Sequence, residues 1–399
     1  MNDFPDFRSP DFLRRHIRDI MDFYHPRCLD PAGGCFHYFK DDGRIYDRRH
    51  RHLVSSARFV FDYATAARRF GDRDYLDATR HCLDFLRHAH RNPDTGGYAW
   101  TLRDGKPEDT TNHCYGLAFV MGACASAARA GIAEASAWMA ETHELLEHRF
   151  WDADAGLYRD EADAAWHVAP YRGQNANMHM CEAMLAAFDA SGERHYLDRA
   201  LLLADHMTRR QAALTDEHLV WEHYHADWRI DWDYNRDNPR HLFRPWGFQV
   251  GHQTEWAKLL MILARHVDAD WLLPTARHLF DTAVARGWDE AHGGLVYGLD
   301  PAGGFCDDDK YYWVQAESLT AAALLAERSG EDAYWQWYER LWQYAWTHFV
   351  DHRYGAWYRI LTRDNRKYDD EKSPAGKTDY HTMGACHELL DPLADATVR

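Results

Sequence analysis

Two histidine–glutamate pairs at helical spacing are the residues of this sequence best suited to proton-transfer chemistry. His179 precedes Glu182 and His252 precedes Glu255, each by three positions. Residues three apart share one face of a helix, so each carboxylate can hydrogen-bond its imidazole, hold its tautomer and raise its basicity. An imidazole titrates near neutral pH and can both take up and return a proton. The pairs therefore predict general acid–base catalysis at two places in the chain.

Each pair lies in one of five stretches that combine polar and aromatic residues. The stretches cover residues 49–54, 171–182, 243–256, 311–317 and 377–381. Each falls where a buried helix is expected to begin after a long loop, and polar groups that converge at one end of a packed ring are typical of a ligand pocket. We therefore expect His179, His252 and His381 to be functional. Other histidines are expected to be surface or satisfied core residues, among them His50, His52, His88 and His223.

A metal site is one alternative interpretation of the same pairs. Two His-x-x-Glu pairs could hold zinc or a carboxylate-bridged metal pair. No further ligand set is evident beside either pair, so the sequence favours a metal-free site. The spacing of His348 and His352 also suits a metal, but both lie at the end of an expected outer helix. We predict a surface position for them.

Two arginines lie near the start of the first expected inner helix. Arg51 could clamp a hydroxyl or stabilise an enolate, or it could form a buried salt bridge instead. Arg58 lies about two turns further into the helix. We predict a structural role for Arg58.

A helical hairpin repeats along the chain about every 60 residues, the kind of period that marks a repeat architecture. Each copy has a short turn, an amphipathic helix and an aromatic turn that usually contains glycine, as in Gly96-Gly97-Tyr98. A second helix, apolar on most sides, follows each aromatic turn. These second helices are expected to start near His52, Thr111, Asn175, Trp246, Trp313 and Tyr380.

The alternation of short and long loops predicts an all-α fold with one domain over residues 1–399. Short loops place neighbouring helices antiparallel, and six hairpins that cannot bury their apolar faces alone close naturally into a ring. We therefore predict an (α/α)6 barrel whose long loops emerge at one end. An open solenoid is the alternative, and the lack of polar capping repeats argues against it.

The composition excludes several classes of partner. The formal net charge is −17, so a phosphate backbone would repel the chain and nucleic acid is not an expected partner. No apolar run is long enough to span a bilayer, and the first residues show no secretory signal. The eight cysteines contain no C-x-x-C pair, so we expect reduced thiols in a cytoplasmic protein.

Taken together, these motifs resemble those of the N-acylglucosamine 2-epimerase superfamily of sugar isomerases and epimerases, in the family's order over nearly the whole chain. The motifs are Arg51-His52-Leu53, Ala57-Arg58, Tyr115 with Ala118-Phe119, Asn175 to His179 with Glu182, Gly251-His252-Gln253 with Glu255-Trp256, Trp313 to Glu317, and Tyr380-His381. The resemblance is strongest to the branch of aldose–ketose isomerases that act on mannose. The family's fold is an (α/α)6 barrel, which agrees with the repeat pattern.

The resemblance implies proton transfer through a cis-enediolate without metal or cofactor. His381 would be the general base at C2, while His252, oriented by Glu255, would open the sugar ring and move the hydroxyl protons. His179 and Arg51 would hold hydroxyls and stabilise the enediolate, whose charge is best met by preorganised donors. The expected substrate-binding residues are Asn175, Tyr115, Trp313 and Glu182.

The expected activity is interconversion of D-mannose and D-fructose, extending to D-lyxose and D-xylulose, by a monomer or homodimer. The alternative is 2-epimerisation, which needs protonation on both faces of C2, and His252 and His381 suit either scheme. A glycoside hydrolase or lyase on the same scaffold would need two carboxylates that flank a bond, whereas Glu182 and Glu255 are better explained as histidine partners. A protein that only binds sugar is the remaining alternative.

Overall fold

Twelve α-helices make up most of the chain in this computed structural model, which describes residues 4–396. They are α1 (Pro10–Tyr24), α2 (Leu53–Phe70), α3 (Arg73–Phe85), α4 (Cys114–Arg129), α5 (Ala133–Arg149), α6 (Gln174–Ser191), α7 (Arg194–Asp205), α8 (Val250–Leu263), α9 (Leu272–Gly287), α10 (Tyr312–Ser329), α11 (Asp332–His348) and α12 (Tyr380–Ala396). The predicted helical class is thereby confirmed.

Burial divides the helices into an inner and an outer set. The inner helix α8 buries 13 of its 14 residues, whereas its outer partner α9 buries 7 of its 16. A helix that is apolar nearly all round must be covered on every side, and one with a single apolar stripe covers others. The even-numbered helices are therefore inner and the odd-numbered helices outer.

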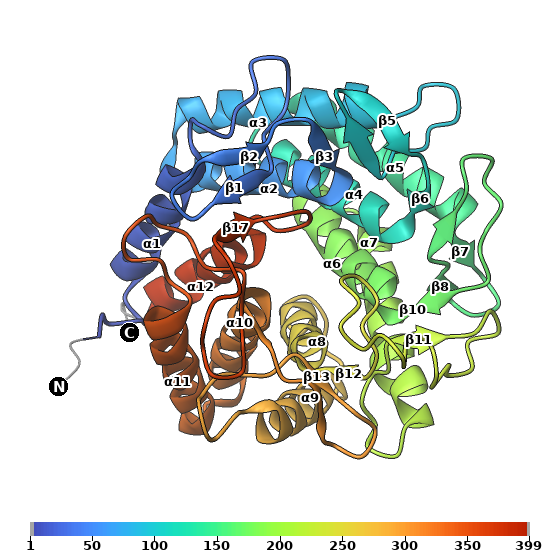
Figure 1. The fold of residues 1–399 in the computed structure, drawn as a ribbon. Helices are drawn as coiled ribbons and strands as arrows, with labels where there is room; N and C mark the ends of the chain where they lie inside the picture. The colour runs from blue at the N-terminus through green and yellow to red at the C-terminus, as the bar shows by residue number, and fades with distance from the viewer. Residues whose placement is uncertain (1–3, 397–399) are drawn as a thin grey trace.

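Contacts between helices follow a circle. Each inner helix packs mainly on one outer partner, and the inner helices pack on one another in the order α2, α4, α6, α8, α10 and α12. Helix α12 also packs against α2 and α1, which brings the two ends of the helical chain together. Figure 1 shows the inner helices nearer the centre of the molecule and the outer helices toward its rim.

Short strands in the long loops repeat the same circular order. Before each inner helix a strand pairs with a strand from the next long loop, and β17, before α12, pairs with β1 in the first loop. The strands are β1 (Tyr38–Lys40), β2 (Ile45–Asp47), β3 (His50–His52), β4 (Thr101–Arg103), β5 (Lys106–Asp109), β6 (Asn112–His113), β7 (Trp151–Asp152), β8 (Leu157–Tyr158), β9 (Glu161–Ala162), β10 (Arg172–Gly173), β11 (His223–Tyr224), β12 (Phe248–Gln249), β13 (Gly298–Leu299), β14 (Phe305–Asp307), β15 (Lys310–Tyr311), β16 (Ile360–Leu361) and β17 (Glu371–Ser373). These antiparallel links fix the loops, and so the start of each inner helix, at one end of the ring.

Buried amide side chains fasten the aromatic turns to the inner helices. The side chain of Gln253 donates to the carbonyl of Val220 (2.8 Å) and accepts from its N–H (3.0 Å). Gln315 forms the same pair of bonds with Leu295 (2.8 and 3.1 Å), and Asn177 binds the end of β8 in this way. A buried backbone group without a partner costs free energy. These amides, which the sequence analysis placed in the ligand stretches, therefore serve the fold.

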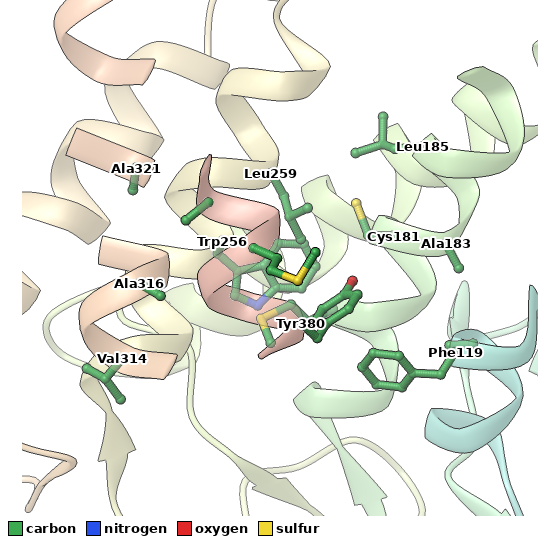
Figure 2. Packing of buried hydrophobic residues seen from close by; sticks show 14 of the residues in the cluster. Phe119, Cys181, Ala183, Leu185, Trp256, Leu259, Val314, Ala316, Ala321 and Tyr380 are labelled. Carbon is green, nitrogen blue, oxygen red and sulfur yellow. The ribbon is translucent and has the colours of Figure 1, made fainter. Parts of the chain in front are cut away.

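Large and small side chains alternate where inner helices meet. Figure 2 shows Trp256 and Leu259 of α8 among the buried side chains, with Ala316 and Ala321 on α10. The Trp256 indole donates to Gln174 Oε1 at the start of α6 (2.9 Å), so even this buried ring has its N–H paired. Small residues on α10 leave room for a close approach to α8, which is how a ring of inner helices reaches the packing density of a protein interior.

All eight cysteines are free thiols. Within the described part of the chain, none of the helices has both the length and the apolar character needed to cross a membrane.

Candidate active site

A cavity of about 100 Å³ opens among the starts of the inner helices. Seven of the predicted site residues line it, namely Tyr115, Asn175, His179, His252, Glu255, Trp313 and His381. The histidine side chains come from α6, α8 and α12 and are 4 to 6% exposed. The convergence expected from the repeat register is therefore present, and it places three imidazoles around one small space.

The protonation state of His381 follows from its two neighbours. Its Nδ1 lies 2.6 Å from Glu317 Oε1, and its Nε2 lies 3.1 Å from Arg58 Nη2. A guanidinium only donates hydrogen bonds, so Nε2 is the unprotonated nitrogen and Nδ1 donates to Glu317. Burial and the adjacent Arg58 lower the pKa of His381 to about 4, against the opposing effect of Glu317. A neutral imidazole with one unprotonated nitrogen is the form that a general base requires.

The carboxylate partner of His252 is Glu222, and the predicted pairing with Glu255 is wrong. His252 Nδ1 lies 2.9 Å from Glu222 Oε1 and at the same distance from Gln174 Nε2. Glu222 stands just before β11, in the loop that crosses from the neighbouring hairpin. The sequence spacing pointed to Glu255 because it shares α8 with His252. The ring of His252 instead hydrogen-bonds to Glu222 in the loop before β11. No pattern in the sequence singled out Glu222.

The predicted pair on α6 is formed. His179 Nδ1 lies 3.0 Å from Glu182 Oε2, and the ring of Tyr115 packs edge-on against the imidazole at 5.1 Å. Burial lowers the pKa of His179, with Glu182 opposing. Glu182 was also predicted to bind substrate. Its side chain instead lies on the far side of His179, outside the cavity lining, so it reaches the substrate only through the imidazole.

Glu255 lines the cavity with a carboxyl group whose ion contact, to Lys258 Nζ, is long at 3.7 Å. Both of its oxygens are buried and neither has a hydrogen bond among the described residues. Burial and the nearby carboxylate of Glu317 raise its pKa well above the usual value. The raised pKa favours the protonated form, in which Glu255 faces the cavity as a hydrogen-bond donor.

The two arginines exchange the roles expected of them. Arg51, predicted to hold substrate, is buried in a salt bridge to Asp30 (2.6 Å) and donates to two backbone carbonyls of its own loop. Arg58, predicted to be structural, lines the cavity between His381 and the carbonyl of Gly376. Arg58 lies within α2 and reaches the cavity, whereas Arg51 belongs to β3, before the helix begins.

Aromatic and amide groups complete the walls. The ring of Trp313 lies 5.1 Å from that of His252 and 5.7 Å from that of His381, so one indole faces both imidazoles. The buried Oδ1 of Asn175 has no partner among the described residues, which leaves an acceptor for a ligand hydroxyl. Further lining residues that lie in the predicted stretches, although no role was predicted for them, are Phe243, Pro245, Tyr311, Tyr312 and Lys377. The lining residues outside those stretches are Leu242, Tyr297, Arg359, Ala375 and Gly376, together with Arg58.

Behind the cavity, the geometry of the buried carboxylates bears on the metal alternative. Glu255 lies close to His179 and Glu182 on one side and to Glu317 and His381 on the other, close enough for a shared ion. The Lys258 Nζ already occupies this position, 2.6 Å from Glu317, 3.2 Å from Glu182 and 3.7 Å from Glu255. A divalent ion would have to displace a buried ammonium that neutralises the same oxygens, so the donor set does not fit a metal centre.

Comparisons with known proteins agree with this site. The model of the N-acylglucosamine 2-epimerase family matches residues 34–385. The chain is 53% identical over 391 residues to D-mannose isomerase of Marinomonas mediterranea, with 98% of this chain and 99% of that protein covered. It is 40% identical over 330 residues to D-mannose isomerase of Thermobifida fusca, with 79% and 78% covered. A crystal structure of D-mannose isomerase superposes with a TM-score of 0.96 at 53% identity, covering 98% of this chain and all of that one.

Proposed function

The chain belongs to the N-acylglucosamine 2-epimerase family, and on this premise we propose that it is an aldose–ketose isomerase that interconverts D-mannose and D-fructose. The observation that carries the proposal is the neutral His381, which presents an unprotonated Nε2 beside Arg58 in the cavity. A base and an oxyanion donor in contact are what proton abstraction next to a carbonyl needs. D-Lyxose, which lacks only the terminal hydroxymethyl group of mannose, is a further substrate of the proposal.

In the proposed mechanism, His381 takes the C2 proton of the open-chain aldose. Arg58 stabilises the negative charge of the enediolate, and His179 accepts a hydrogen bond from a sugar hydroxyl through its unprotonated Nε2. A proton moves from O2 to O1 as His381 returns the carbon-bound proton at C1. His252, held by Glu222, moves protons between the ring oxygen and the hydroxyls. Each imidazole has its Nδ1 against a carboxylate, so each can act through Nε2.

Substrate positioning in this scheme uses the cavity walls. Trp313 supplies an apolar face for the C–H groups of the sugar, while Asn175 and Tyr115 bind hydroxyls. In its protonated form, which the raised pKa favours, Glu255 donates a hydrogen bond to an oxygen of the substrate. The scheme needs no metal, because the Arg58 guanidinium supplies the positive charge that the enediolate requires.

Incubation with D-mannose and separation of the products tests the activity. Fructose is expected, and lyxose should give xylulose. Glucose without fructose would favour the 2-epimerase alternative. That reaction needs proton transfer on both faces of C2, and His252 and His381, which both lie beside Trp313, are the two groups that would supply it. Absence of any turnover would overturn the proposal.

Isotope exchange tests the assignment of the base. In deuterated water, recovered mannose should gain deuterium at C2, and His381→Ala should abolish this exchange. Exchange that persists in the variant would place the base elsewhere. His348→Ala is the matched control, because this histidine lies at the end of α11 and does not line the cavity.

We also propose that the chain is one (α/α)6 barrel over residues 4–396, since residues 1–3 and 397–399 of the predicted domain 1–399 lie outside the described residues. The support is the circular order of the inner helices, together with the β17–β1 pairing that links the last long loop to the first. An open solenoid would leave the first and last repeats apart. One cooperative unfolding transition, followed by circular dichroism and by tryptophan fluorescence, is the expected behaviour.

A further inference from the structure

Lys258 is a buried cation that no part of the proposed mechanism uses. It projects from α8 and is 7% exposed. Its Nζ lies 2.6 Å from Glu317 Oε2 and 3.2 Å from Glu182 Oε1. The same two carboxylates accept hydrogen bonds from Nδ1 of His381 and from Nδ1 of His179, respectively. Five side chains therefore form one continuous chain of charged contacts from one imidazole to the other.

The chain runs behind the sugar cavity. Lys258, Glu182 and Glu317 do not line that cavity, but they do line a second one of about 350 Å³. The second cavity lies toward the C-terminal ends of the inner helices, where Arg68 of α2 and Arg129 of α4 also line it. Lys258 can thus influence the reaction only through its neighbours, and it is accessible from the side opposite the sugar.

Resting on the proposed function, we propose that Lys258 is a positioning residue that keeps Glu182 and Glu317 ionised and so holds both His179 and His381 with Nδ1 protonated and Nε2 free. Each carboxylate must accept a hydrogen bond from Nδ1–H so that its histidine can act through Nε2. One ammonium shared between two carboxylates sets both tautomers at once.

Charge balance supports this role. Three carboxyl groups surround the ammonium: Glu255 and Glu317 are buried, and the side chain of Glu182 is 22% exposed. Burial favours the protonated form of a carboxyl group. The charge of Lys258, together with hydrogen bonds from His179 and His381, outweighs burial and lowers the pKa values of Glu182 and Glu317. The pKa of Glu255, which lies farther from Nζ at 3.7 Å, is instead raised. The titratable and charged groups that face this cluster are Arg58 of α2, Tyr115 of α4, His179 and Glu182 of α6, Glu255 of α8, Glu317 of α10, and Tyr380 and His381 of α12.

Loss of the ammonium should reverse the tautomers. Without Lys258 the pKa of Glu317 rises, so Glu317 becomes protonated at neutral pH and donates to Nδ1 of His381. The imidazole then carries its proton on Nε2 and cannot act as a base. At higher pH Glu317 ionises again and the active tautomer returns, so the defect depends on pH.

Lys258→Met tests this expectation in steady-state kinetics. At pH 7 we expect kcat to fall about 100-fold or more, by analogy with wrong-tautomer variants of other enzymes, with KM changed by no more than about threefold. The acid limb of the kcat profile should move up by at least about one pH unit. The matched control is Lys372→Met. It removes a buried lysine of β17 that pairs with Asp351, and the variant should keep the wild-type pH profile.

Chemical rescue separates positioning from a folding defect. Lys258→Ala should regain activity with ethylammonium, saturably, because the second cavity gives the amine access to Glu182 and Glu317. A uniform loss at every pH with no shift of the acid limb and no rescue would overturn the proposal. So would an unchanged kcat.

A measurement without substrate keeps the two proposals distinguishable. In protein labelled with 15N-histidine, the ring signals of His381, identified by their loss in His381→Ala, should report protonated Nδ1 in the wild type and protonated Nε2 in Lys258→Met at pH 7. The same tautomer in both would contradict the role of Lys258 even if no sugar is turned over. Absent turnover with the expected tautomer change would contradict only the proposed function.

Discussion

At the residue scale, the chemistry depends on which nitrogen of each imidazole carries the proton. Three carboxylates, Glu182, Glu222 and Glu317, each face an Nδ1, yet only the first stands on the same helix as its histidine. A local spacing rule therefore finds the first partner and misses the others. The three histidines could be located from the sequence because their register repeats, but their partners depend on how helices and loops pack.

The partner of His252 gives the first prediction. Glu222→Gln should lower kcat by roughly 100- to 10,000-fold with little change in KM, because a neutral amide no longer fixes the Nδ1 proton. Steady-state kinetics with mannose measures both constants. Glu255→Gln should lose less turnover, because burial and Glu317 raise the pKa of Glu255 and so favour its neutral form, which glutamine resembles. A larger defect in Glu255→Gln than in Glu222→Gln would restore the pairing expected from the sequence.

The two arginines give the second prediction. Arg58→Met removes the cation beside His381, so the pKa of the imidazole rises from about 4 and the acid limb of kcat/KM moves to higher pH. The loss of a donor to the enediolate should also lower kcat by roughly 100-fold or more. Arg51→Met should instead reduce stability while the folded fraction retains its kcat, because Arg51 pairs with Asp30. The reverse pattern in the two variants would return Arg51 to the active site.

At the element scale, the fold could be predicted further than the site. The hairpin period indicated all twelve helices, and the aromatic turns marked where the loops attach. Two-residue strands and amide clamps such as Gln253 and Gln315 carry no local signature, because the hydrogen bonds join segments that are distant in sequence. Their amides therefore looked like ligand-binding groups until the packing was known.

The crossing of α8 and α10 gives the third prediction. A Cβ on Gly251 would lie 2.5 Å from a ring carbon of Trp313 and 2.9 Å from the side chain of Val314. Gly251→Ala should therefore push the indole into the cavity, raise KM and cost about 1–3 kcal/mol of stability through overpacking. Kinetics and urea unfolding measure the two effects.

The control for this substitution lies on α4. A Cβ on Gly122 would meet nothing within 4 Å. Gly122→Ala should leave KM unchanged and add about 0.5–1 kcal/mol through helix propensity. An unchanged KM in Gly251→Ala would show that the Trp313 ring can move without affecting substrate binding. It would contradict the proposal that this indole contacts the substrate.

At the scale of the whole molecule, many buried histidines tie folding to pH. The buried histidines whose pKa is lowered by burial are His16, His37, His52, His90, His113, His179, His223, His381 and His387. The buried carboxyl groups most strongly shifted the other way are Asp62, Asp160, Glu255 and Asp307. The histidines outnumber the carboxyl groups, so unfolding between pH 6.5 and 5 should take up protons on balance.

The sign of this linkage gives the last prediction. A histidine with a folded pKa near 4 and an unfolded pKa of 6.5 stabilises the fold above pH 6.5, and this contribution is lost as the pH falls toward 4. A net uptake of two protons would lower the free energy of unfolding by roughly 4 kcal/mol between pH 6.5 and 5. Urea unfolding at a series of pH values measures this slope. A free energy of unfolding that stays flat across the window would contradict the burial of these rings in their neutral form.

One histidine allows the argument to be tested on a single proton. Both ring nitrogens of His387 are buried without a hydrogen bond among the described residues, and burial lowers its pKa to about 3. His387→Leu removes no bond but does remove one proton from the balance. The variant should therefore show a slope smaller by about 1.4 kcal/mol per pH unit for the lost proton. Its stability should exceed that of the wild type at pH 5 by more than at pH 7.5, and a parallel offset at both pH values would mean that His387 contributes packing alone.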